Sequence, residues 1–573
     1  MAKFLIAFGR KETPLSQNDL RRAFQPECAA LGIKKPDTHV CGHVSTAMLG
    51  GDELVCHEDR AFCFGILLRD QKEWAKVGSN TPEGAYALVR YDDETIELVT
   101  DMVASRAIWY AVTDDKFIVS TSQFAVIRSL PDLQFDQTTL AWYLAAGTLG
   151  PYRSWDARVQ MLKPDSVLRF DRHAWRHTVQ TGNVEFCEAR SSEAATTKDL
   201  EGTIDASFSQ VRLDEKSWHI SLSGGYDSRL NLLKIGPTKL QCFSHGRRDA
   251  LSDPVGDAAV AKSIAVAVGA KFEFLPFDLS DYSPSVLLTS LLHASDGRVS
   301  NFTGVLDNLD SFRKLSAEGV RGIVRGDECF GWLETTTEED VRRGVGLPLL
   351  SDFYAPAQIA EWGLTCPELP VEWQRRPAES RENWRDRLYQ GYRLPLVLAP
   401  LSDIVLNFME VANPLLTHPI IRMVRRLPPN LRTAKKSIKH ISLKLKPRIP
   451  YATNGSLPPY SEYWSQGFLI ELAAVLSNPA AKKVFNNSFI EHVLTLIPLH
   501  AAERTNSRRR WGKLASRFLP KSLRSVLRLT VARPKLGREL ALNAYMALRV
   551  YELLTAEPVA GASHSSSFSA AAS

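Results

Sequence analysis

The chain has 573 residues, of which 44% are hydrophobic and 23% charged, and its formal net charge is +6. This length and composition predict two or three globular domains. No stretch of about 18 uncharged apolar residues occurs, which argues against a membrane-spanning helix. The apolar part of the N-terminus is too short for a signal peptide, and the eight cysteines form no Cys-x-x-Cys pair. Both features favour a cytoplasmic protein with reduced thiols.

Basic residues gather in two segments of the C-terminal half. Residues 421–448 hold ten Lys or Arg and no acid, and residues 501–540 hold twelve against two acids. Such segregation favours a polyanionic or acidic partner, although a solvated basic helix face produces the same pattern. RNA binding is one interpretation, but few aromatic side chains (Trp511 and Phe518) interleave with the second segment. We therefore expect no nucleic-acid partner.

The first 185 residues are expected to be rich in β-strands. Apolar and polar residues alternate on either side of short polar turns, which is typical of hairpins. The pattern predicts one helix over residues 140–144 and strands over residues 1–10, 84–93, 96–101, 107–112, 117–121 and 167–170. Residues 191–197, rich in Ser, Ala and Thr, are interpreted as a linker.

From about residue 200 strands alternate with helices, which predicts a parallel sheet covered by helices. Helix 257–269 is expected to start with Asp257 as a good N-cap and to stop at Gly269. The predicted strands cover residues 218–222, 240–246, 272–275 and 320–324. Ligands of an open parallel sheet bind at the carboxyl ends of its strands. Asp227 and Asp327 both follow such ends, so we expect their carboxylates to lie close together.

The turn Ser223-Gly224-Gly225-Tyr226-Asp227-Ser228 carries the strongest functional signal. It lies between the strand at 218–222 and a helical stretch at 229–234. Glycines let backbone N–H groups approach phosphate oxygens, the helix start adds partial positive charge, and the two serines add hydroxyl donors. A carboxylate at Asp227 would repel phosphate unless a hard cation lay between them, which indicates Mg²⁺.

The kinase-type phosphate loop and the Gly-x-Gly-x-x-Gly dinucleotide motif are both absent from the sequence. The Ser-Gly-Gly-x-Asp-Ser turn instead resembles the pyrophosphate loop of ATP pyrophosphatases, which split ATP into AMP and pyrophosphate. An ordinary strand-to-helix turn rich in small residues is the alternative interpretation.

Further motifs extend this resemblance to the asparagine-synthetase superfamily, over most of residues 80–450. After the loop at 223–228, the family has a helix motif matched by 257–269. Its Gly-Ser-Asp-Glu-x-Phe-Gly-Gly turn is matched by 325–331, and its Val-Arg-Val-Pro-Phe-Leu-Asp segment by 411–417. The first match is highly specific, and the others follow in the family's order.

The resemblance implies the fold. An α+β domain, a β-sandwich similar to the Ntn-hydrolase glutaminases, is expected over residues 1–185. An α/β ATP-pyrophosphatase (HUP-like) domain with a parallel sheet and a helical C-terminal region is expected over 200–560. Low-complexity residues 561–573 are expected to be a disordered tail.

The sequence departs from the family at two positions. The family's glutaminase uses a cysteine directly after the initiator Met, where this chain has Ala2. Glutamine is therefore not the expected nitrogen source. An acidic or tyrosine residue that the family places three positions before the Mg²⁺ aspartate is Val324 here. Glu410 and Glu328 are candidates for deprotonating the acceptor amine, and a structural ion pair is the alternative for both.

The resemblance also implies the site. Asp227 and Asp327 would hold Mg²⁺. Lys446 and Arg448 lie near the position of a family lysine that stabilises pyrophosphate, with surface charge as the alternative for Lys446. ATP and its pyrophosphate would contact Ser221, Leu222, Ser223, Gly224, Gly225, Asp227, Ser228, Phe243, Ser244, His245, Arg298 and Gly322.

Family members without the glutaminase cysteine include β-lactam synthetases and lasso-peptide cyclases. The segment Arg448–Pro458 and the helical region around 543–551 most resemble the cyclases. This implies an ATP-dependent macrolactam synthetase that joins an Asp or Glu side chain of a core peptide to its N-terminal amine. Its partners would be the precursor peptide, a leader-peptide-binding protein and a peptidase. The alternatives are an ammonia-dependent asparagine synthetase, another small-molecule amide ligase, and a scaffold without catalysis, which the intact loop disfavours.

Overall fold

The computed structural model describes residues 3–49, 55–58, 60–67, 73–188, 194–279, 283–301, 306–498 and 536–556. Most of the basic segment 501–540, the start of the predicted linker and the predicted tail lie outside the described residues. Within the described ranges, no helix combines the length and the apolar character needed to cross a bilayer.

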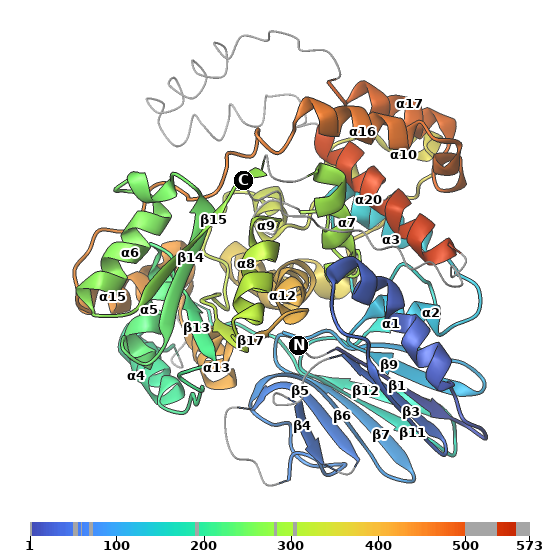
Figure 1. Cartoon of the computed structure of the whole chain (residues 1–573), viewed down its shortest axis with the longest axis horizontal. Helices are drawn as coiled ribbons and strands as arrows, with labels where there is room; N and C mark the ends of the chain where they lie inside the picture. Colours follow the sequence, from blue (N-terminus) through green and yellow to red (C-terminus); the bar gives the residue numbers. More distant parts are fainter. Residues whose placement is uncertain are drawn as a thin grey trace.

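Two six-stranded antiparallel sheets form the N-terminal part. The first has the order β10-β8-β9-β1-β3-β2, at Gln160–Met161, Trp109–Val112, Lys116–Ser120, Lys3–Gly9, Val44–Leu49 and Asp37–Cys41. The second has the order β12-β11-β7-β6-β5-β4, at Arg176–Thr181, Ser166–Asp171, Thr95–Thr100, Gly84–Tyr91, Ala61–Leu67 and Val55–Glu58. The predicted hairpin strands are confirmed, and Figure 1 shows the two sheets at the base of the molecule.

Successive side chains of a strand point to opposite faces of its sheet, so alternate residues pack into different layers. In β1, Phe4, Ile6 and Phe8 belong to the apolar layer between the two sheets. Leu5 and Ala7 face the other way, into the core that includes helices α1 (Gln17–Leu31) and α2 (Gln123–Arg128). The N-terminal part is therefore a β-sandwich with helices on its first sheet, as predicted.

A five-stranded parallel sheet forms the second part. Its order is β15-β14-β13-β16-β17, at Phe272–Phe277, Gln241–Arg247, Trp218–Ser221, Gly322–Val324 and Glu410–Ala412. Helices α5 (Tyr226–Ile235) and α6 (Asp257–Ala267) supply apolar residues to the face that contains Ile220 and Cys242. Helix α8 (Leu306–Ala317) covers the face that contains Phe243 and Ile323. The predicted parallel sheet is confirmed, with helices on both faces (Figure 1).

The second part contains further helices. They are α4 (Thr197–Phe208), α7 (Pro284–Ala294), α9 (Glu338–Val345), α10 (Pro356–Glu361), α11 (Arg381–Leu388), α12 (Ala399–Leu406), α13 (His418–Arg426), α14 (Pro429–Arg432), α15 (Lys436–Lys444), α16 (Gln466–Leu476), α17 (Asn487–Thr495) and α20 (Arg538–Thr555). The expected helix around 140–144 is α3 (Gln137–Ala146).

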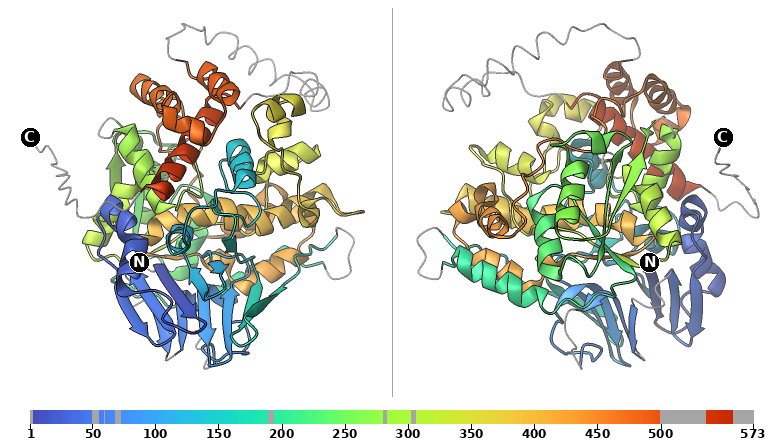
Figure 2. Two further views of the ribbon diagram at one scale, coloured as in Figure 1. Left: turned by 90° about the vertical axis from the view of Figure 1, so that its right-hand side faces the viewer. Right: turned by 60° about the vertical axis from the view of Figure 1, so that its left-hand side comes forward.

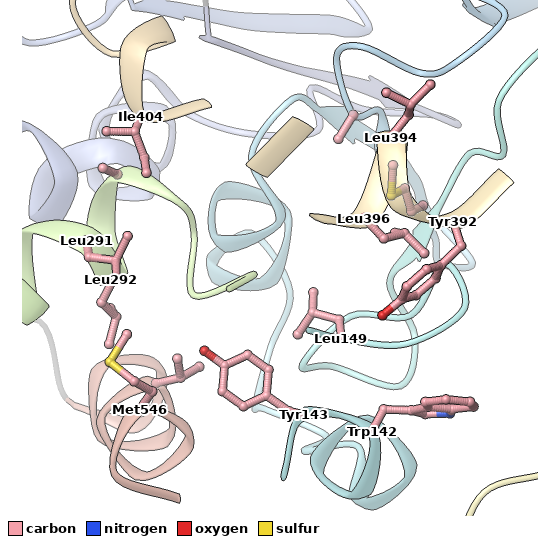
Figure 3. Packing of buried hydrophobic residues seen from close by; sticks show 14 of the residues in the cluster. Trp142, Tyr143, Leu149, Leu291, Leu292, Tyr392, Leu394, Leu396, Ile404 and Met546 are labelled. Carbon is pink, nitrogen blue, oxygen red and sulfur yellow. The ribbon is translucent and has the colours of Figure 1, made fainter. Parts of the chain in front are cut away.

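The two parts share one apolar core. In the left view of Figure 2, α20 (red) lies between α7 (green) and α3 (cyan), and it contacts both helices. Figure 3 shows Met546 of α20 close to Tyr143 of α3 and to Leu292 of α7. The last described helix of the chain is therefore part of the contact between its two halves.

We expect Met546→Ala to destabilise the protein by about 2–5 kcal/mol, because it leaves a cavity in this shared core. Met546 is 0% exposed. Urea unfolding monitored by circular dichroism measures the change. The matched control is Ile470→Ala in α16, where the side chain is 55% exposed and the expected change is within about 0.5 kcal/mol. Equal effects of the two substitutions would contradict the packing of α20.

Buried charges also cross this contact. Glu27 of α1 is 1% exposed and accepts hydrogen bonds from Arg128 at 2.6 and 2.8 Å, and His293 of α7 lies 3.6 Å away. Burial raises the pKa of Glu27, but Arg128 and His293 outweigh it and hold the pKa at about 2. The carboxylate is thus ionised at neutral pH and favours the folded state.

Glu27→Gln is expected to cost about 3 kcal/mol of unfolding free energy at neutral pH, from the shift in pKa between 4.5 and about 2. A depressed carboxyl pKa stabilises the fold above the unfolded value and loses that contribution as the pH falls through the folded value. The difference between the two proteins should therefore shrink below pH 4.5 in urea unfolding at a series of pH values. An offset that does not change with pH would contradict this. Glu318→Gln, on the surface of the same molecule, should change little.

Candidate active site

The turn at residues 223–228 lies at the carboxyl end of β13, the central strand of the parallel sheet. Leu222 N donates to the Phe243 carbonyl at 2.8 Å, which holds the start of the turn against β14. Helix α5 begins at Tyr226, three residues earlier than the sequence predicted, with Gly225 as its N-cap. No side chain caps this helix start, so its N–H groups point to an anion site.

The two serines of the turn are bound to each other. Ser228 Oγ accepts from Ser223 N at 3.0 Å and shares a hydrogen bond with Ser223 Oγ at 2.7 Å, and Gly225 N donates to Ser223 Oγ at 3.2 Å. These bonds close the turn into a rigid ring. The two hydroxyls that the sequence placed as phosphate donors therefore lie side by side.

Asp257 has a different role from the one expected. Gly256, not Asp257, is the N-cap of α6, and no side chain caps that helix. The Asp257 carboxylate instead accepts from Gly224 N at 2.9 Å, and burial raises the pKa of Asp257. We expected the Gly224 N–H to donate to phosphate. It donates instead to the Asp257 carboxylate, and this hydrogen bond links the turn to α6. The expected stop is confirmed at Gly269, whose φ is +71°.

Lys435 joins two acidic side chains of the site. Its Nζ lies 2.7 Å from Asp227 Oδ2 and 3.0 Å from Glu328 Oε2. Ala434 and Lys435 have φ of 57° and 55°, a left-handed conformation that costs energy in residues with a side chain. Sequence reasoning missed Lys435. The only signal for it was the basic segment 421–448, which does not distinguish one lysine from its neighbours.

Asp327 lies at the end of β16, beside this cluster. Asn413 Nδ2 donates to Asp327 Oδ2 at 2.8 Å, and Asp327 N donates to Asn413 Oδ1 at 3.2 Å. Arg325 Nη2 is 3.6 Å from Asp327 Oδ1. Asn413 is a second residue whose role the sequence did not predict. It fixes both the backbone and the carboxylate of Asp327.

The electrostatics of the cluster follow from its burial. Burial raises the pKa of Asp227, and repulsion from Asp327 adds to the rise, while Lys435 opposes it. Burial and repulsion from Asp227 likewise raise the pKa of Glu328. Burial lowers the pKa of Lys435, but the two carboxylates outweigh it and the net shift is upward. The structure therefore places Asp227 and Glu328 on one ammonium group. Asp327 lies close enough to repel Asp227, as expected for the two aspartates.

The donor set suits a hard cation shared with a substrate. Asp227 Oδ1 is buried and has no hydrogen-bond partner among the described residues. Carboxylate oxygens are the ligands that Mg²⁺ prefers, usually one or two of them together with substrate phosphates. In the described ranges, no group of three or more His, Cys, Asp or Glu side chains is arranged to hold a metal ion.

Gly326 allows the strand ends to approach. A Cβ on Gly326 would lie 2.8 Å from the backbone carbonyl carbon of Asp227 and 2.9 Å from Ser228 N. These are backbone atoms in the first turn of α5, which cannot move aside as a side-chain end can. The turns after β13 and β16 therefore pack backbone to backbone.

Gly326→Ala is expected to destabilise the fold by about 1–3 kcal/mol, because the methyl group overpacks this contact. The matched control is Gly344→Ala in α9, whose Cβ would meet only Leu333 at 3.5 Å and which should be neutral or stabilising. Both changes can be read from urea unfolding curves. Equal stability of the two variants would show that the turns do not touch.

Three predicted nucleotide contacts lie on β14. Phe243 and Ser244 are buried, and His245 is half-buried near the carboxyl end of the strand. Burial lowers the pKa of His245 to about 4, and the nearby charge of Arg325 contributes. His245 is thus neutral at physiological pH and adds no charge to the site.

Gly322 and Glu410 lie at the opposite end of the sheet from the turn. The parallel register pairs Trp218, the first residue of β13, with Gly322, and Gly322 with Glu410. Both residues thus begin their strands. Glu410 is 0% exposed and forms an ion pair with Arg106 of the N-terminal part. Neither residue is brought to the turn, and for Glu410 the alternative of a structural ion pair agrees with the geometry.

Arg298 is also held away from the turn. It is 2% exposed, pairs with Asp403 and stacks over the Trp109 ring at 5.4 Å. Asp296, two residues before Arg298, forms an ion pair with Lys3 of β1 at 3.4 Å. The loop that carries Arg298 therefore contacts the N-terminal part of the chain, and the Arg298 side chain is paired with a carboxylate and not available to a phosphate.

Lys446 and Arg448 are both exposed. The segment that follows them reaches the turn, since Ala452 N donates to the Gly224 carbonyl at 3.2 Å. A Cβ on Gly224 would lie 2.5 Å from the Ala452 side chain. The structure thus places the backbone after Arg448 at the site, whereas the partly buried cation of the site is Lys435.

No protein-family model and no curated protein matches the chain. Among solved structures, the chain is similar to glutamine phosphoribosylpyrophosphate amidotransferase from B. subtilis, complexed with ADP and GMP. The identity is 10% and the TM-score 0.19, over 48% of this chain and 65% of that one, just under two thirds of its length. It is also similar to an allosteric regulatory enzyme of purine biosynthesis, at 10% identity and a TM-score of 0.20, over 60% and 77% of the two chains. At these TM-scores the likeness carries no argument about function.

Proposed function

We propose that this chain is an ATP-dependent amide ligase of the asparagine-synthetase type, which releases AMP and pyrophosphate. One observation carries the proposal. The Ser-Gly-Gly-x-Asp-Ser turn lies at an uncapped helix start, and Asp227 and Asp327 converge beside it at the carboxyl ends of adjacent parallel strands. That combination suits a triphosphate bound with a divalent cation.

The chemistry that fits the site is activation of a carboxylate. Amide formation from a free carboxylate is uphill in water, so a carboxylate oxygen first attacks the α-phosphorus of ATP and pyrophosphate leaves. An amine then attacks the acyl carbon of the adenylate, the amine loses a proton and AMP leaves. The protein mainly positions the groups and neutralises the charge that develops on the departing phosphates.

The residues divide these tasks. The first N–H groups of α5, with the hydroxyls of Ser223 and Ser228, bind the departing pyrophosphate. The Lys435 ammonium balances the negative charge of the cluster. Asp227 and Asp327 would hold Mg²⁺, which when bound neutralises phosphate charge.

Glu328 is the proposed proton acceptor for the amine. It lies in the cluster, 3.0 Å from Lys435, and burial raises its pKa, which brings a carboxylate nearer to the basicity that proton transfer requires. Glu410, the other candidate, is buried in its pair with Arg106 and does not reach the cluster.

The proposed substrate is a ribosomal core peptide, whose Asp or Glu side chain is joined to its own N-terminal amine in a lasso macrolactam. Support comes from Ala2, which stands where the family's glutaminase has cysteine, and from the sequence of residues 448–458. A precursor peptide, a leader-peptide-binding protein and a peptidase would be the partners, in the cytoplasm. An ammonia-dependent asparagine synthetase or a β-lactam-synthetase-like ligase is the alternative. Formation of asparagine from aspartate, ammonium and ATP would favour the former.

We expect Asp227→Asn to lower AMP and pyrophosphate formation from Mg-ATP and a carboxylate substrate by at least about 100-fold, because it removes a charged cation ligand. Asp205→Asn is the control, since that carboxylate is exposed on α4. Chromatography of the nucleotide products measures both. Cleavage of ATP to ADP by the wild type, or unchanged AMP formation by the Asp227→Asn variant, would contradict the proposal.

A further inference from the structure

A cavity lies at the contact between the β-sandwich and the parallel sheet. Its volume is about 300 Å³, and its walls come from the ends of β5 and β6, the loop before β13, and the residues after β17. Figure 1 shows β17 next to β5 at this boundary, and the two strands are in contact. A volume of this size is at the lower end of what small-ligand sites provide.

The side chains on this wall are mainly apolar. Ile66, Leu67 and Ala85 come from the sandwich, and Leu213 and Leu416 come from the second part. Neither part of the chain forms the cavity alone. Polar groups of Gln210, Arg212, Asn413 and Thr417 also line it. Such a lining suits an apolar group that carries a polar one.

A smaller cavity of about 40 Å³ lies next to it. Ala85, Asn413 and Leu416 line both cavities, and Asp327 lines the smaller one. Asn413 is the residue that holds the Asp327 carboxylate at 2.8 Å. The apolar cavity is therefore adjacent to a smaller one that Asp327 of the candidate site lines.

The smaller cavity also has hydrogen-bond donors. Arg106 lines it, is 4% exposed, and has a buried Nε with no partner among the described residues. Its guanidinium already pairs with Glu410, which leaves this remaining N–H as the donor that lacks an acceptor. The Asn413 amide is a second donor. A carboxylate is an acceptor that suits both groups.

We propose that these two cavities bind the carboxylate substrate, with its carboxyl group facing Arg106 Nε and the Asn413 amide and an adjoining apolar group in the larger cavity. The substrate class is thus a carboxylic acid with an apolar neighbour, such as an acidic residue next to apolar residues in a peptide, and not free aspartate. This rests on the proposed function for the role of the acid, but binding can be measured without turnover.

The test uses the full chain and two probes, 3-phenylpropionate and aspartate. Binding is followed by ligand-observed NMR without ATP, and activation is followed by ATP–pyrophosphate exchange. The variant Ala85→Leu narrows both cavities. Ala267→Leu, on the exposed end of α6, is the matched control. We expect the wild type to bind 3-phenylpropionate at least tenfold more tightly than aspartate, and Ala85→Leu to remove that preference while the control keeps it.

The outcomes separate the two proposals. Equal binding of both acids, or a preference that Ala85→Leu leaves unchanged in a protein of normal unfolding midpoint, overturns the assignment of the cavities. Selective binding of 3-phenylpropionate that is lost in Ala85→Leu, without exchange for any acid, supports the cavity and overturns the ligase. A second variant, Leu213→Ala, enlarges the cavity and should restore binding to Ala85→Leu.

Discussion

The ammonium group of Lys435 between Asp227 and Glu328 is the interaction on which the candidate site depends. Two partly buried carboxylates in one cluster, with Asp327 beside them, repel each other, and a shared cation offsets that repulsion. The strained backbone at Ala434 and Lys435 is consistent with this demand, because it aims the lysine from the start of α15 into the site. The arrangement concentrates negative charge where a metal–triphosphate complex is proposed to bind.

A second constraint is the union of the two parts of the chain. Helix α20 packs on α3 and α7, Asp296 pairs with Lys3, and Glu410 pairs with Arg106. The two ion pairs are buried, so loss of one partner would leave the other charge buried without a counter-charge. The β-sandwich thus has a structural task. Its Trp155 donates a hydrogen bond to the Gly297 carbonyl in the loop after α7, and residues of β5 and β6 line the cavity beside β17.

Much of this architecture could be predicted from local patterns. Alternating residues in 84–101 specify a hairpin, and the apolar run before Ser223 with the glycines after it specifies a strand, a turn and a helix start. Positions at strand ends were also predictable, because parallel strands carry their ligands at one edge. Asp227 and Asp327 are therefore neighbours in the structure. The errors concern residues whose place depends on register: Gly322 and Glu410 begin their strands and so lie at the far edge.

The amino-acid sequence by itself determined the two sheet types, the Ser-Gly-Gly-x-Asp-Ser turn and the place of Asp227 and Asp327 after strand ends, because these follow from periodicity and short-range turn chemistry. Only the tertiary structure decided which cations serve the site. Lys435 is 208 residues from Asp227 in the chain, and Arg298 is turned to Asp403 by contacts with Trp109. The sequence does not distinguish one Lys or Arg from another. Long-range packing and burial determine which of them forms an ion pair with a carboxylate.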